Sequence, residues 1–122
     1  MGHFNITPPV EVAIPSDMSI QVTEVQGADD QPIVLASNYL KFVFFDRERN
    51  VVECVHDPTG QQSTNTEYDQ DTGILRLLVP TRGMVTGQLS CKVFTRTADP
   101  AFADGHWDVC TPMERINIKL VD

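Results

Sequence analysis

The sequence has no long hydrophobic run and no recognisable targeting signal. No segment approaches the roughly 18 consecutive apolar residues of a membrane-spanning helix. The N-terminal residues lack a basic stretch followed by an apolar one, so no secretory signal peptide is recognised. We therefore expect a protein that is made in a cytoplasm and has no membrane as a partner.

Cysteine is scarce, and the cysteines that are present show no paired spacing. Cys54, Cys91 and Cys110 are odd in number, and no CxxC motif occurs. We expect free thiols in a reducing compartment. His106 and Cys110 have the four-residue spacing of some zinc ligands, but no second ligand pair lies nearby in the sequence. We therefore predict no metal and no other cofactor.

The acidic residues Asp99, Asp104 and Asp108 are close together in the sequence but do not form a known calcium motif. They lack the alternating ligands and the terminal Glu of an EF-hand loop. Asp99 precedes a proline and Asp104 precedes a glycine, which are combinations typical of turns. We interpret both residues as turn formers.

Basic residues are also few. The chain has nine Lys and Arg against 17 Asp and Glu, which gives a net charge of −8. Nucleic-acid backbones and anionic membrane surfaces repel such a chain, so we predict neither as a partner.

No catalytic or nucleotide-binding motif is present. None of the three histidines lies in a recognised local signature, and neither GxxxxGK[ST] nor GxGxxG occurs. His56, which is followed by Asp57, is the best candidate for a general base. Because it opens a loop, we expect it to lie in solvent. We predict that the protein is not an enzyme.

What the sequence does contain is alternation with a period of two. Leu89, Cys91 and Val93 alternate with polar residues, which is typical of a half-buried strand, and no helical apolar stripe runs for ten residues. Alternation or a short apolar run marks the other expected strands, at 18–22, 33–35, 39–45, 51–55, near 67–68, 74–79, 107–110 and 115–121.

Two pairings follow from the turn signals. We predict that 73–80 and 87–96 form a hairpin at the centre of the core, with Gly83 at positive φ in the connection. The aromatic segment 39–45 is predicted to pair with 51–55 through a charged turn.

A length of 122 residues fits one domain. Seven or eight short strands with turns between them predict an all-β fold, an antiparallel β-sandwich of immunoglobulin-like type over residues 18–122. Residues 1–17 are rich in proline, so we expect an extended N-terminal arm that pairs along a sheet edge or reaches a neighbouring subunit. The residues predicted to make the inter-subunit contact are Phe4, Ile6, Val10 and Val12.

Several segments together resemble a known group of proteins: the aromatic strand at 40–45, the segment 72–78, the strand start at 87–90, the loop end at 102–105, and a final Ile-x-Ile-x-Leu strand. The chain resembles small immunoglobulin-like virion proteins of tailed bacteriophages. It is most similar to N-terminal domains of upper baseplate or fibre proteins and their equivalents in phages of Bacteroidales.

The resemblance implies a structural subunit of the particle, in the baseplate, at a fibre anchor or as a capsid decoration. Its partners would be other virion proteins, in a homo-oligomer or ring, and it would be made in the bacterial host cytoplasm and reside in the virion. Since the sequence ends at Asp122 without a fibre region, an adaptor, decoration or anchoring subunit is expected.

The alternative function is a stand-alone carbohydrate-binding β-sandwich. Trp107 and Tyr39 would form a platform on which a sugar stacks, and Asp104 in the acidic loop 99–108 would be a further sugar contact.

Overall fold

The computed structural model describes residues 10–22, 25 and 33–122. Among these residues the chain is all-β, without a helix. The nine strands are β1 (Val10–Ala13), β2 (Asp17–Val22), β3 (Tyr39–Phe45), β4 (Val51–His56), β5 (Thr66–Asp69), β6 (Ile74–Pro80), β7 (Gly87–Ala98), β8 (His106–Cys110) and β9 (Glu114–Val121). Eight of them match expected strands, and β1 is additional because part of the predicted arm is also paired.

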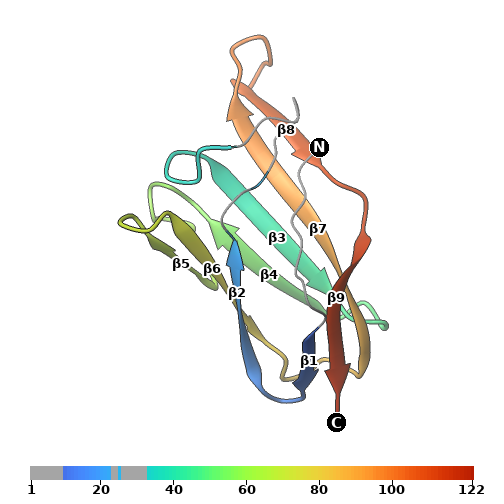
Figure 1. The fold of residues 1–122 in the computed structure, drawn as a ribbon. Helices are drawn as coiled ribbons and strands as arrows, with labels where there is room; N and C mark the ends of the chain where they lie inside the picture. Colours follow the sequence, from blue (N-terminus) through green and yellow to red (C-terminus); the bar gives the residue numbers. More distant parts are fainter. Residues whose placement is uncertain (1–9, 23–24, 26–32) are drawn as a thin grey trace.

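The strands form two sheets that pack together (Figure 1). The larger sheet has the order β1-β9-β7-β3-β4, with β8 paired to β7, and the smaller sheet has the order β2-β6-β5. All pairs are antiparallel except β1 with β9, which is parallel. The predicted all-β sandwich is confirmed at this level.

The core lies between the sheets and is filled by the apolar positions of the alternating strands. The alternation predicted for β7 is confirmed, because Leu89, Cys91 and Val93 are buried. From β3 the core receives Leu40 and Phe42, whose side chains are fully buried. The other strand residues in the core are Met18, Ile20, Val22, Phe44, Cys54, Leu75, Leu77, Val79, Ile118 and Leu120.

The predicted hairpin between 73–80 and 87–96 is wrong. β6 pairs with β2 and β5, whereas β7 lies in the other sheet between β3 and β9. Each strand has one apolar face, and these faces cover each other best from opposite sides of the core. The connection turns between the sheets at Thr81, whose hydroxyl donates a hydrogen bond to the Ser16 carbonyl at 2.6 Å. Gly83 has a φ of 90°, as predicted.

The pairing of 39–45 with 51–55 is confirmed, as the antiparallel β3–β4 hairpin. The strand predicted at 33–35 is wrong, because this segment pairs with no strand and Leu35 begins a turn. Leu35 is nevertheless buried, and Ile33 packs against the core. An apolar run this short anchors a turn as well as it forms a strand, and periodicity does not distinguish the two.

The predicted arm is described only from Val10 onward. Residues 10–13 form β1, which pairs with β9 of the same chain and lies at one edge of the larger sheet. Val12 packs against the core, while Val10 is 38% exposed. Of the two arrangements expected for the arm, this part adopts pairing along a sheet edge. Phe4 and Ile6 lie outside the described residues.

Candidate functional site

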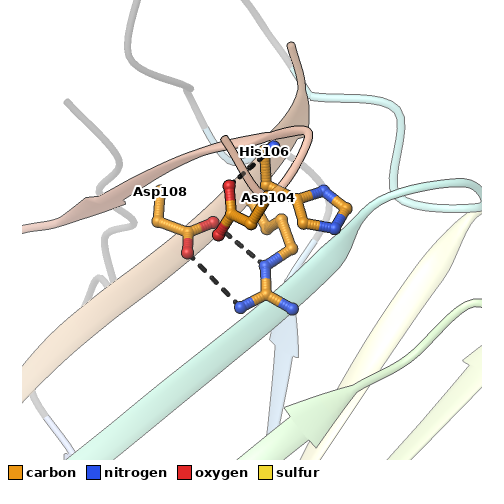
Figure 2. Close-up of polar contacts among 4 residues, drawn as sticks. Asp104, His106 and Asp108 are labelled. Atoms are coloured by element: carbon orange, nitrogen blue, oxygen red, sulfur yellow. Dashed lines mark hydrogen bonds and ion pairs between the residues drawn. The ribbon is translucent and has the colours of Figure 1, made fainter. Parts of the chain in front are cut away.

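The β7–β8 hairpin extends beyond the ends of the other strands (Figure 1). Two acidic side chains shape its loop. Asp99 accepts a hydrogen bond from the Ala101 amide at 2.9 Å, and Asp104 accepts one from the His106 amide at 3.1 Å (Figure 2). The interpretation of Asp99 and Asp104 as turn formers is therefore confirmed.

An ion pair joins the two strands of this hairpin. Arg96 of β7 lies directly opposite Asp108 of β8, and its Nε and Nη2 donate to the two carboxylate oxygens at 3.0 and 3.3 Å (Figure 2). This hydrogen-bonded pairing raises the pKa of Arg96 above its ordinary value. The guanidinium also lies over the Tyr39 ring, 5.0 Å from the centroid. Arg96 thus connects β8 to β3 across the face of the sheet.

Tyr39 and Trp107, the two aromatics of the predicted sugar platform, are not brought together. Tyr39 and Asp108 are both register partners of Arg96, so they share its face of the sheet. Trp107 is the residue before Asp108 and projects from the opposite face. Its ring stacks on Phe102 instead, with centroids 6.3 Å apart, and Trp107 remains 41% exposed.

A pocket of about 300 Å³ lies between the start of β3, the loop after β4 and the β7–β8 hairpin. Its lining combines one aromatic ring with side chains that donate or accept hydrogen bonds. The residues are Ser37, Asn38, Tyr39, Asp57, Pro58, Thr59, Gln62, Arg96, Ala98 and His106. Of the predicted sugar contacts only Tyr39 lines it. The remaining residues that line the pocket were not predicted, because they come from three separate segments and no local sequence pattern connects them.

The loop after β4 is organised by Asp57. Its carboxylate accepts hydrogen bonds from the Thr59 amide and hydroxyl and from the Gln62 amide, at 2.8–3.0 Å. These bonds, the one from the Thr59 amide first, hold the pKa of Asp57 below its ordinary value. The carboxylate is therefore charged at neutral pH, and it holds this wall of the pocket in place.

His56, which we expected in solvent, is buried instead. Its Nε2 is hydrogen-bonded to the carbonyl of Leu35, and its ring lies 5.3 Å from that of Tyr68. Because a carbonyl only accepts hydrogen bonds, this nitrogen carries the proton and is not available as a general base. The position is inward because His56 pairs with the buried Leu40 in the β3–β4 register.

The outer face of the larger sheet carries aromatic rings and cations in alternation. Lys41 lies over Phe94 at 5.5 Å, and Lys92 lies over Phe45 at 5.8 Å. These side chains are half-buried, because each long stem covers the neighbouring ring. The sheet thus presents a mixed apolar and cationic surface that includes Arg96, whose guanidinium lies over the rings of Tyr39 and Phe94.

Within the part of the chain that the structure describes, no group of three or more His, Cys, Asp and Glu side chains has the arrangement of a metal site. The described segments also contain no helix that is long and apolar enough to cross a membrane. No protein-family model matches this sequence, and a search of curated proteins finds no match.

Proposed function

We propose that this protein is a structural subunit of a tailed-bacteriophage particle, built on an immunoglobulin-like sandwich, and that it acts through protein–protein contacts. The strand order supports the immunoglobulin-like type. β2, β6 and β5 correspond to strands B, E and D, and β9, β7, β3 and β4 correspond to G, F, C and C′ of a variable-type domain.

The observation that carries the proposal is the composition of the outer face of the larger sheet. Tyr39, Phe45 and Phe94 are held there at half exposure by Lys41, Lys92 and Arg96. Aromatic residues and arginine are the side chains enriched in protein interfaces, because they supply large contact areas with a polar end. A face of this kind supports binding of another protein surface.

The edge strand β1 supplies a second reason. Among the described residues β1 is the edge strand of the larger sheet, and an edge strand can pair with another chain. The predicted contact residues Phe4 and Ile6 lie six and four positions before Val10, the first residue of this strand. A segment that continues from an edge strand is well placed to extend onto a neighbouring subunit.

The test is the mass of the full chain in solution, measured over a range of concentrations. We expect a discrete oligomer that the Phe4→Asp, Ile6→Asp double variant weakens, because a charge is costly in a buried contact. Asn5→Asp is the matched control and should leave the mass unchanged. A chain that is monomeric at every concentration, and that is not retained by isolated phage particles, would refute the proposal.

A second candidate function, carbohydrate binding, is favoured by the pocket beside Tyr39. It offers one aromatic ring and several hydrogen-bonding side chains, which is the combination that sugars require. On a glycan array, Gln62→Ala should abolish any binding that occurs there. Trp107→Ala is the control, because Trp107 projects from the other face. Binding that depends on Trp107 and not on Gln62 would contradict this location.

A further inference from the structure

At their strand positions, the outer faces of the two sheets carry opposite net charge. The described strands of the larger sheet present five cations and three carboxylates outward, a net charge of +2, although the chain as a whole carries −8. We assign each of these eight charged side chains to the outer face from its register partner and from the alternation of side chains along a strand. These residues are Lys41, Lys92, Arg96, Arg115, Lys119, Glu11, Glu53 and Asp108.

The smaller sheet has the reverse balance. Its outward positions carry three carboxylates, Asp17, Glu67 and Asp69, and one cation, Arg76, a net charge of −2. Arg76 is already paired with Glu67 at 2.9 Å, so the remaining acidic charge belongs to the two aspartates. This face is also partly apolar, because Ile74 and Leu78 of β6 lie on it at half exposure.

We propose that the outer face of the larger sheet (the front) binds the outer face of the smaller sheet (the back) of a second copy of this chain. The inference rests on the proposed function and specifies its contact. The cations around Lys92 would meet the aspartates of the neighbour, and the rings beside them would cover Ile74 and Leu78. Front-to-front and back-to-back contacts each bring like charges together and are disfavoured.

Such a contact has a consequence for the assembly. A front-to-back interface uses two different surfaces on each subunit, so each copy retains one open face after binding. Subunits therefore add on to form a ring or a filament, and a closed two-fold dimer does not result. The net charge of −8 opposes association at long range, but salt screens this repulsion beyond about 8 Å at physiological ionic strength. The complementary charges at the contact are screened less.

The experiment uses two charge reversals in the full chain, one on each face. Lys92→Glu changes the centre of the larger sheet, and Asp17→Lys changes the exposed end of β2. Each variant alone should self-associate on the order of tenfold more weakly than the natural chain, because like charges then face each other. Arg82→Glu and Glu48→Lys are the matched controls, since both residues are exposed in connections away from the two faces.

The decisive sample is an equal mixture of the two variants. In a front-to-back contact the acidic front of one variant meets the basic back of the other, and both unaltered faces also meet, so the mixture should regain association. Thermal unfolding of each variant verifies that it is folded. An oligomer that neither reversal weakens, or a mixture that does not recover, overturns this contact while leaving the assembly role intact. A chain that is monomeric at every concentration overturns this contact, and it overturns the assembly role as well when isolated phage particles do not retain it.

Discussion

Asp46 has a buried carboxylate, and we expect its replacement to destabilise the sandwich. It lies in the β3–β4 turn and accepts four hydrogen bonds at 2.8–2.9 Å. Oδ1 binds the amides of Glu48 and Asn50, and Oδ2 binds the Asn50 side chain and the Val85 amide. The last bond attaches the turn to the connection that leads into β7.

Asp46→Asn keeps the shape of this side chain but replaces one acceptor oxygen with an amide group that donates. Two of the four bonds are then lost, and the remaining two lose their charged acceptor. A hydrogen bond to a charged group contributes about 1.5–3 kcal/mol. Glu48 and Asn50 are exposed, so their amides regain water, whereas Val85 is half-buried. We therefore expect a net loss of about 2 kcal/mol in the free energy of unfolding.

Urea unfolding at neutral pH measures this loss. Glu48→Gln is the matched control, because it removes an exposed carboxylate from the same turn while leaving the backbone amide in place. Its effect should remain within about 0.5 kcal/mol. A loss below that value for Asp46→Asn would refute the assignment of these four bonds as stabilising.

The pH dependence supplies an independent check. Burial alone would raise the pKa of Asp46, but the bonds from Asn50, Val85 and Glu48 together lower it below its ordinary value of 3.8. A lowered pKa contributes stability above 3.8 that is lost as the pH falls through the folded-state pKa. The difference between the natural chain and Asp46→Asn should thus be constant near neutrality and should narrow on acidification below 3.8. A difference that widens there would contradict the reasoning.

Three further predictions concern the thiols, the core and one turn. A thiol reagent at mildly alkaline pH should modify exposed Cys110 rapidly and Cys54 only on unfolding, since burial raises the pKa of Cys54 to about 12; a fast phase that survives Cys110→Ser would contradict this. Phe42→Ala should cost about 3–5 kcal/mol in urea unfolding, and exposed Phe102→Ala less than about 1; equal losses would place Phe42 outside the core. Gly83→Ala should cost about 1–2 kcal/mol through its positive φ alone, because no atom lies within 4 Å of the added methyl group; no loss would argue against that φ.

The raised pKa of Cys54 also predicts how the stability of the fold changes at alkaline pH. The raised pKa of Cys54 contributes stability below the ordinary value of 9.0, and that stability is lost as the pH rises toward about 12.

The candidate site was less predictable than the strands. Tyr39 was identified as a possible contact because aromatic residues are conspicuous, but its neighbours Gln62 and Arg96 were not. They reach the same pocket from the β4–β5 loop and from β7. The expected platform of Tyr39 and Trp107 failed for a local reason: a shift of one residue in a strand places a side chain on the other face of the sheet.

Within this protein, the sequence by itself determined most of the strands and the face that each of them buries, although the short apolar run at 33–35 forms no strand. Leu89, Cys91 and Val93 alternate with polar side chains, and only an extended backbone separates the two sets, so the strand and its buried face are local properties. Only the tertiary structure decided which strands pair. β6 and β7 are adjacent in the sequence and joined by a short connection, yet they lie in opposite sheets. The alternating pattern requires that each apolar face be covered but does not specify which strand covers it. The pairing was decided by the burial of the apolar faces of β6 and β7 in one core, from opposite sheets.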